Sequence, residues 1–203
     1  MKDFLIIAIA HLLAVASPGP DLAVVAKNCM NGNIRDGIKT SFGIGVGIMT
    51  HVTLSLLGLA ILLKSNPMVF NTVRIAGSLY LIYLGYKSIS SNSNYHISKS
   101  SENSRKSENM FLSGYLTNIL NPKATLFFLT LFTQVIPSTT SLLIKSFYGL
   151  EMVAMTIIWF SFVSVILTHK KLRPAFEKYE NKINWFFGLV LILIGFVVLS
   201  EML

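Results

Sequence analysis

The stretch AVASPGPDLAV, residues 14–24, places two prolines, a glycine and an aspartate inside an otherwise apolar segment. That segment covers residues 4–26, which as a helix is long enough to cross the hydrocarbon core of a bilayer. Proline lacks an amide proton and its ring collides with the carbonyl one turn earlier, so Pro18 and Pro20 are expected to interrupt the helix. The backbone groups freed there cannot face lipid, and we therefore expect the break to lie against protein or a wet cavity.

The composition predicts that the whole chain resides in a membrane. Hydrophobic residues make up 53% of the 203 residues and charged residues only 13%, which is too apolar for an ordinary water-soluble domain. Six apolar segments are candidates for spanning helices, and they cover residues 4–26, 38–63, 68–89, 110–136, 142–167 and 185–199. The predicted fold class is an all-α integral membrane protein with six transmembrane helices.

Residues 90–109 divide the six segments into two groups of three. This stretch is dominated by Ser and Asn, and it cannot bury enough apolar surface to fold. It predicts a flexible cytoplasmic linker between a first three-helix repeat, residues 1–89, and a second, residues 110–203.

The second half repeats the break of the first. Residues 120–124 read LNPKA, so Pro122 is expected to interrupt the fourth span as Pro18 and Pro20 interrupt the first. The third and sixth spans also resemble each other, over residues 75–86 and 186–196. An odd number of spans per half inserts the second half upside down relative to the first. The sequence thus predicts two inverted repeats, with helices 1 and 4 broken.

Residues beside the two breaks are suited to shaping them. Gly19 is expected to allow a sharp turn, and Ser17 and Asn121 are expected to cap the half-helices that restart after the breaks. A restarted helix directs its free amides and the positive end of its dipole at whatever occupies the cavity. This arrangement predicts a carboxylate site.

The distribution of Lys and Arg predicts the orientation. Loops on one side hold twelve of these residues and loops on the other side four. The twelve are Lys27, Arg35, Lys39, Lys87, Lys99, Arg105, Lys106, Lys170, Lys171, Arg173, Lys178 and Lys182. Because cytoplasmic loops are enriched in basic residues, both termini are expected outside the cytoplasm. The same bias accounts for the net charge of +8, and no loop interleaves basic and aromatic residues as a nucleic-acid surface would.

Asp21 and Lys123 each follow a proline and stand near the first turn of a restarted half-helix. An ionisable side chain near the bilayer centre usually faces a partner or a water path. The hypothesis is that Asp21 binds a substrate ammonium or a proton, while Lys123 and the freed amides bind a carboxylate. The alternative is that Asp21 and Lys123 pair with each other to neutralise their burial.

Four motifs together resemble the LysE/RhtB family of amino-acid exporters: ASPGPD at 16–21, GIKTSFGIGVG at 37–47, YLIYLGYKS at 80–88 and GYLTNILNPKATLFF at 114–128. The resemblance covers essentially the whole chain. It implies a bacterial inner-membrane exporter that moves amino acids or close derivatives outward by proton antiport, with amino acid and protons as its partners. The motif match implies substrate-binding or transport roles for Ser17, Pro18, Gly19, Pro20, Asp21, Asn121, Pro122 and Lys123.

Two further ionisable residues are candidates for a proton relay. His51, in the second predicted span, could line the cavity or relay a proton, and it could equally be a hydrogen-bonded core histidine. Glu151, in the fifth, could carry a second proton, or it could extend to the outer interface with Lys145. The GxxxG at Gly43 and Gly47 predicts close helix packing within the bundle or in a homo-oligomer.

Other function classes fit the sequence less well. A membrane oxidoreductase would need paired cysteines, and Cys29 is the single cysteine. No arrangement of nucleophile and base, phosphate loop or haem motif is visible, so neither an enzyme nor a cofactor is predicted. The four histidines are scattered, so no metal site is predicted, and a metal or small-ion exporter is kept as the alternative function.

Overall fold

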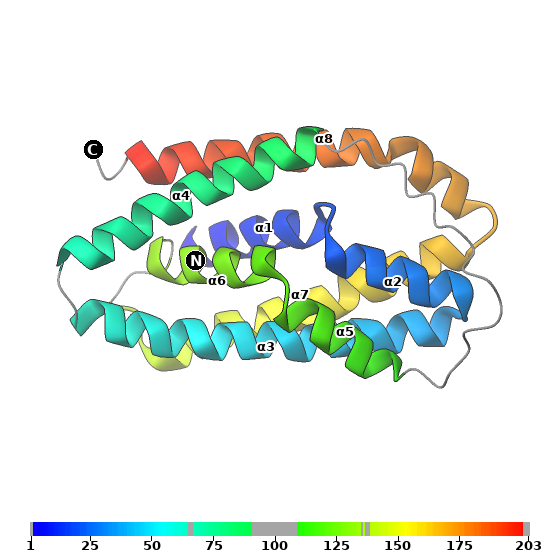
Figure 1. Ribbon diagram of the computed structural model, residues 1–203, viewed down its shortest axis with the longest axis horizontal. Coiled ribbons are helices and arrows are strands. Elements are labelled where there is room, and N and C mark those ends of the chain that lie inside the picture. Colours follow the sequence, from blue (N-terminus) through cyan, green and yellow to red (C-terminus); the bar gives the residue numbers. More distant parts are fainter. Residues whose placement is uncertain (1, 65–66, 91–108, 135, 137–138, 201–203) are drawn as a thin grey trace.

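The computed structural model describes residues 2–64, 67–90, 109–134, 136 and 139–200, and in these residues it contains eight α-helices and no strand (Figure 1). The helices are α1 Lys2–Ala16, α2 Pro20–Asn31, α3 Ile34–Lys64, α4 Pro67–Ser90, α5 Met110–Ile119, α6 Pro122–Gln134, α7 Leu142–Thr168 and α8 Leu172–Ser200. The predicted all-α class is confirmed. The predicted linker at 90–109 lies, apart from its two end residues, outside the described residues.

Both predicted helix breaks are present. The first apolar segment divides into α1 and α2, whose axes are bent by 56°, and the fourth divides into α5 and α6. Pro20 and Pro122 each stand at the first position of the restarted helix, where the missing amide proton costs no intrahelical hydrogen bond. Proline therefore acts as a start signal for α2 and α6 as well as a stop signal for α1 and α5.

The helices form an elongated bundle (Figure 1). Helices α4 and α8 pack along each other on one side, while α3 packs with α5 and α7 on the other. Helices α1, α2 and α6 lie between these two layers, and α5 leads into α6 from the α3 side. Helices α1 and α5 run toward the middle from opposite ends, and α2 and α6 run away from it, so both breaks lie near the centre of the bundle.

Several polar side chains are buried inside the bundle beside an apolar core, and many large apolar side chains are exposed on its outside. Thr40, Ser41 and Asn118 are fully buried, whereas Leu143 and Leu57 are 82% and 60% exposed. A water-soluble domain would expose far fewer large apolar side chains over a continuous surface. The pattern agrees with an α-helical membrane protein whose outer surface contacts lipid.

Length and apolar character single out part of this bundle as membrane-spanning. Within the described residues, Ile34–Gly58 of α3 and the whole of α7 are long and apolar enough to cross a bilayer, and the bent pair Phe4–Ala16 and Pro20–Asn31 passes the same test as either a broken span or a re-entrant loop. Pro122–Phe132 and Asn181–Val197 are shorter apolar helices. Six spans remain a prediction.

Glycines of α3 allow α5 to approach closely. A methyl group added at Gly47 would lie 2.5 Å from the side-chain oxygen of Asn118, and one added at Gly43 would collide with the main chain at Phe111. The predicted packing role of this GxxxG is confirmed within one chain. The close approach places Asn118 against the centre of the bundle.

Several predicted loop positions are wrong. Helix α2 extends to Asn31 and α3 begins at Ile34, so the predicted loop residues Lys27, Arg35 and Lys39 belong to helices. Helix α8 begins at Leu172 rather than near 185, so Arg173, Lys178 and Lys182 are also helical. Lys, Arg and Glu are good helix formers, so a helix continues beyond the apolar stretch that identifies it.

Candidate functional site

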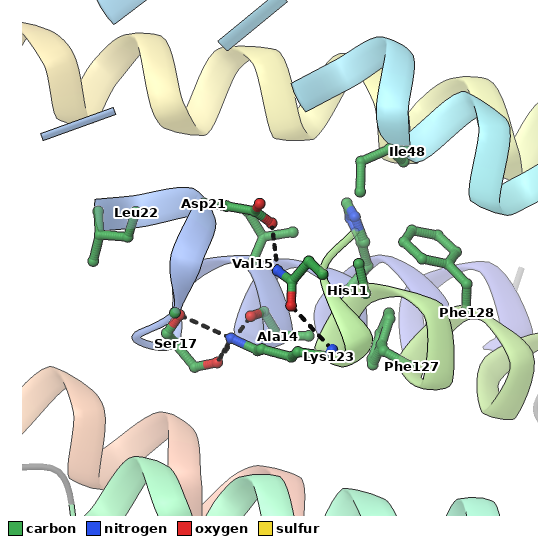
Figure 2. A pocket seen from close by; sticks show the side chains of 13 residues that line it. His11, Ala14, Val15, Ser17, Asp21, Leu22, Ile48, Lys123, Phe127 and Phe128 are labelled. Carbon is green, nitrogen blue, oxygen red and sulfur yellow. Dashed lines mark hydrogen bonds between the residues drawn. The ribbon is translucent and has the colours of Figure 1, made fainter. Parts of the chain in front are cut away.

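The two helix breaks border a small cavity in the middle of the bundle (Figure 2). The centres of water molecules can occupy about 30 Å³ of this cavity, so it has room for roughly two waters. One end is polar and is lined by Ser17, Asp21, Asn121 and Lys123. The other end is mainly apolar and aromatic, and is lined by Ile48, Phe127, Phe128 and the ring of His11. Such a mixture of apolar walls and few polar groups is typical of small-molecule sites.

The Asp21 carboxylate takes its hydrogen bonds from the opposite half of the chain. Its Oδ2 accepts from Nδ2 of Asn118 at 2.9 Å and from Nδ2 of Asn121 at 3.2 Å. Its Oδ1 is buried and has no hydrogen-bond partner among the described residues. A buried carboxylate oxygen without a donor is costly, so Oδ1 is an open acceptor for a cationic or N–H group.

The Lys123 side chain crosses in the reverse direction, from α6 to the end of α1 (Figure 2). Its Nζ donates to the main-chain oxygens of Ser17 at 2.9 Å and Pro18 at 3.3 Å, and to the Ser17 hydroxyl. These carbonyls stand at the C-terminal end of a helix, where the dipole favours a cation. Each break therefore supplies the polar partners that the other break needs.

Asp21 and Lys123 do not pair directly. In the part of the chain that the structure describes, no ion pair joins them, because Asp21 is bonded to two side-chain amides and Lys123 to two carbonyls and a hydroxyl. The alternative of a mutually neutralising pair is wrong for this conformation. Two opposite charges thus line one cavity, each bonded to neutral groups.

The expected roles of the cap residues hold in part. The Asn121 side chain accepts from the Lys123 amide at 3.0 Å and so caps α6 as predicted. Ser17 does not cap α2, since its hydroxyl donates back to the Ala14 carbonyl of α1 at 2.9 Å. The chain bends at residues 17–19 as predicted, and Gly19 itself is extended within this bend, with φ 176° and ψ −178°.

The start of α2 consequently carries no side-chain cap. Its N-cap residue is Gly19, which has no side chain to offer, whereas α6 has the Asn121 side chain in this position. The first amides of a helix have no partner within the helix itself. The α2 terminus therefore presents uncapped amides and the positive end of its dipole beside the cavity.

His51 is a hydrogen-bonded residue of the core. Its Nε2 donates to the main-chain oxygen of Asn118 at 3.0 Å, and its ring stacks on Phe128 with 5.9 Å between centroids. It therefore supports the residue that donates to Asp21. Glu151 does not extend to the outside, because both carboxylate oxygens are buried, and neither has a hydrogen-bond partner among the described residues.

Sequence reasoning missed two residues of the site. Asn118 bonds directly to Asp21, and the sequence feature that pointed to it was a second asparagine three residues before Asn121, at the end of the helix that the predicted break interrupts. His11 lines the cavity and is 0% exposed. The sequence feature that could have identified His11 as a site residue is its position, two helical turns before the predicted break at Pro18. In the described ranges of the chain, no group of three or more His, Cys, Asp or Glu side chains could hold a metal ion.

Comparison with known proteins gives consistent matches over most of the chain. A family model described as LysE type translocator matches residues 12–202. The chain is 25% identical to the threonine efflux protein of Escherichia coli (strain K12) over 192 residues, covering 91% of each protein. It is 26% identical to the threonine efflux protein of Salmonella typhimurium, covering 93% of each. It is 28% identical to the leucine efflux protein of Salmonella choleraesuis, covering 78% of this chain and 74% of the relative. No solved structure matches the chain.

Proposed function

This chain belongs to the LysE type translocator family, and from that premise we propose that it exports amino acids from the cytoplasm across the bacterial inner membrane. Translocators move solutes and are not enzymes, so the protein is a transporter. Relatives named threonine and leucine efflux proteins support an amino acid as the solute. We propose further that an inward flow of protons drives the export.

One observation carries the proposal: the charges of Asp21 and Lys123, which form no ion pair with each other, line one cavity where the two broken helices meet. An amino acid carries an ammonium and a carboxylate on one carbon. A site with one anion, one cation and uncapped helix amides is complementary to both groups. Buried charges without such a role would be expected to pair with each other.

The contacts suggest how the substrate binds. The substrate ammonium meets Oδ1 of Asp21, which has no partner among the described residues. The substrate carboxylate meets the uncapped start of α2 and the Lys123 ammonium, which turns away from the carbonyls of Ser17 and Pro18. An amino acid is several times larger than a water molecule, so the cavity must widen before the substrate fits.

We propose that this widening is a movement of two inverted three-helix repeats, residues 1–89 and 110–203, relative to each other. The opposite directions of the two broken pairs support the inversion (Figure 1). So does the contact of the predicted third and sixth spans, where a methyl group added at Gly188 would lie 2.5 Å from the Gly85 carbonyl oxygen. The polar partners exchanged between the breaks would separate and re-form as the repeats rock.

The proton path and the orientation are also proposals. Asp21 is the proposed proton acceptor, and a proton arriving from outside would compete with the substrate ammonium there. His51 and Glu151 are proposed relay residues, supported by the hydrogen bond from His51 to Asn118 and by the buried, unpartnered carboxylate of Glu151. Both termini are proposed to lie outside the cytoplasm, with six spans between them.

The proposal is tested by feeding mixed dipeptides to cells and analysing the amino acids that appear in the medium. Cells with this protein should release one or a few amino acids faster than cells with an empty vector. Cells with the Asp21→Asn variant, present in the membrane at equal abundance, should match the empty vector. Identical profiles from all three strains would refute amino-acid export.

A further inference from the structure

The apolar end of the cavity contains a polar side chain that the proposed ammonium and carboxylate contacts leave unused. His11 on α1 is 0% exposed and lines the cavity. Its Nε2 lies 3.3 Å from the Thr156 hydroxyl oxygen on α7. Its Nδ1 is buried and has no hydrogen-bond partner among the described residues. Buried polar atoms nearly always have a partner, so this nitrogen requires one.

The imidazole ring is held by its neighbours on both sides. Helical hydroxyls elsewhere in the bundle, such as those of Thr40 and Ser164, donate to the carbonyl four residues earlier, whereas the Thr156 hydroxyl contacts His11. The rings of Phe127 and Phe128 lie 6.2 and 5.8 Å from the His11 ring, centroid to centroid. Thr156 therefore occupies one ring nitrogen, and the other has no partner among the described residues although the ring belongs to the lining of the cavity.

We propose that His11 is a specificity-determining residue that binds a hydroxyl group on the side chain of the transported amino acid. The inference rests on the proposed function: with the ammonium and carboxylate at the polar end, the substrate side chain extends toward His11, Phe127 and Phe128. The substrate class is then the short amino acids that carry a side-chain hydroxyl.

A hydroxyl suits Nδ1 in either tautomer of the ring. If Nε2 donates to Thr156, Nδ1 has a lone pair and accepts the substrate O–H; if Nε2 accepts from Thr156, Nδ1 carries the proton and donates to the substrate oxygen. A methyl group can do neither and would leave the buried nitrogen unpaired. Sites built to hydrogen-bond a hydroxyl reject analogues that lack it far more strongly than apolar pockets reject an extra methylene.

This inference distinguishes the threonine efflux relatives from the leucine efflux relative. The side chain of threonine supplies the hydroxyl that His11 needs, and its methyl group suits the apolar walls at Ile48 and Phe127. The side chain of leucine supplies no hydrogen-bonding group. The chemistry of the cavity therefore favours a threonine-like substrate, as in the threonine efflux relatives, over a leucine-like one.

The test compares threonine with valine, which has nearly the same shape but a methyl group in place of the hydroxyl. Rates of release are measured from proteoliposomes loaded with each labelled amino acid. The intact protein should release threonine at least about tenfold faster than valine. In His11→Phe, which keeps a flat ring but has no nitrogen, the ratio should fall to near one, and in Thr156→Val it should fall part of the way. Ser164→Ala, on the same helix as Thr156 but with its hydroxyl bonded to its own helix, should keep the original ratio.

The outcomes separate this inference from the proposed function. Release of threonine and valine at equal rates by the intact protein, or an unchanged ratio in His11→Phe, overturns the inference and leaves amino-acid export standing. If His11→Phe does not insert or releases neither substrate, the test uses Thr156→Val instead. A ratio of threonine release to valine release that is unchanged in Thr156→Val overturns the proposed role of His11 and Thr156. If the intact protein releases no amino acid from a mixed pool, the proposed function fails and the inference fails with it.

Discussion

At the scale of single residues, Lys123 is the side chain that most directly joins the two halves. Its ammonium, carried on α6, donates to the carbonyls of Ser17 and Pro18 at the end of α1. Lys123→Met keeps an unbranched side chain but leaves these buried carbonyls without a donor. We expect the free energy of unfolding to fall by about 1–3 kcal/mol, measured as a lower Tm of the protein in detergent.

The matched control for this substitution is Lys39→Met. The Lys39 side chain is 65% exposed and its ion pair with Asp36 is long, at 3.9 Å. Exposed pairs contribute little because solvent screens them, so the change should stay within about 0.5 kcal/mol. A Tm for Lys123→Met as high as that of the control would contradict the bridging role of Lys123.

The residues of the site differ in how far the sequence predicts them. Proline chemistry is local, so the breaks at Pro20 and Pro122 and the position of Asp21 beside one of them follow from the sequence. The partners of Asp21 are not local, because Asn118 and Asn121 lie 97 and 100 residues further along the chain. The same holds for His11 and Thr156, which are 145 residues apart. Only the packing of α5 and α7 against the N-terminal half brings these groups together.

At the scale of helices, the contact of α3 with α5 places Asn118 for its bond to Asp21. A methyl group at Gly47 would lie 2.5 Å from Oδ1 of Asn118, so Gly47→Ala must separate the helices or displace Asn118. We expect a loss of about 1–3 kcal/mol in the free energy of unfolding, together with slower transport. A Tm measurement and an export assay on the same preparation check both effects.

Gly58 offers a matched control on the same helix. No atom lies within 4 Å of a methyl group added there. Gly58→Ala should keep the transport rate and should not lower the Tm, because alanine is favoured over glycine inside a helix by about 0.5–1 kcal/mol. Equal effects of Gly47→Ala and Gly58→Ala on the Tm and the transport rate would show that the α3–α5 contact contributes to neither.

The boundaries of the helices show where sequence patterns fail at this scale. The start of α8 was missed because residues 172–184 are rich in charge, and charge does not prevent helix formation. Pro174 does not prevent it either, since it stands in the first turn, where proline is tolerated. Apolar length marks only the part of a helix suited to lipid, and α8 begins before that part.

At the scale of the whole molecule, the proposed orientation has a direct test. Alkaline phosphatase is active only outside the cytoplasm, so a fusion after Leu203 should be active, and an insertion within residues 90–109 should be inactive. The reason is the excess of Lys and Arg on the side of the linker. Activity at the linker and none at the C-terminus would reverse the orientation. Activity at both sites would contradict the division into two groups of three spans.

The central claim is that an amino acid crosses the membrane through the cavity between the two broken helices. The most direct test is the release of labelled threonine from proteoliposomes that hold the intact protein, Asp21→Asn or Asp36→Asn at equal abundance. Asp36 lies near the start of α3, away from the cavity, and serves as the matched carboxylate control. We predict release at equal rates from the intact protein and Asp36→Asn, and at least about tenfold slower release from Asp21→Asn, which lacks the charge that binds the ammonium. Release from Asp21→Asn at the rate of the intact protein would contradict the claim.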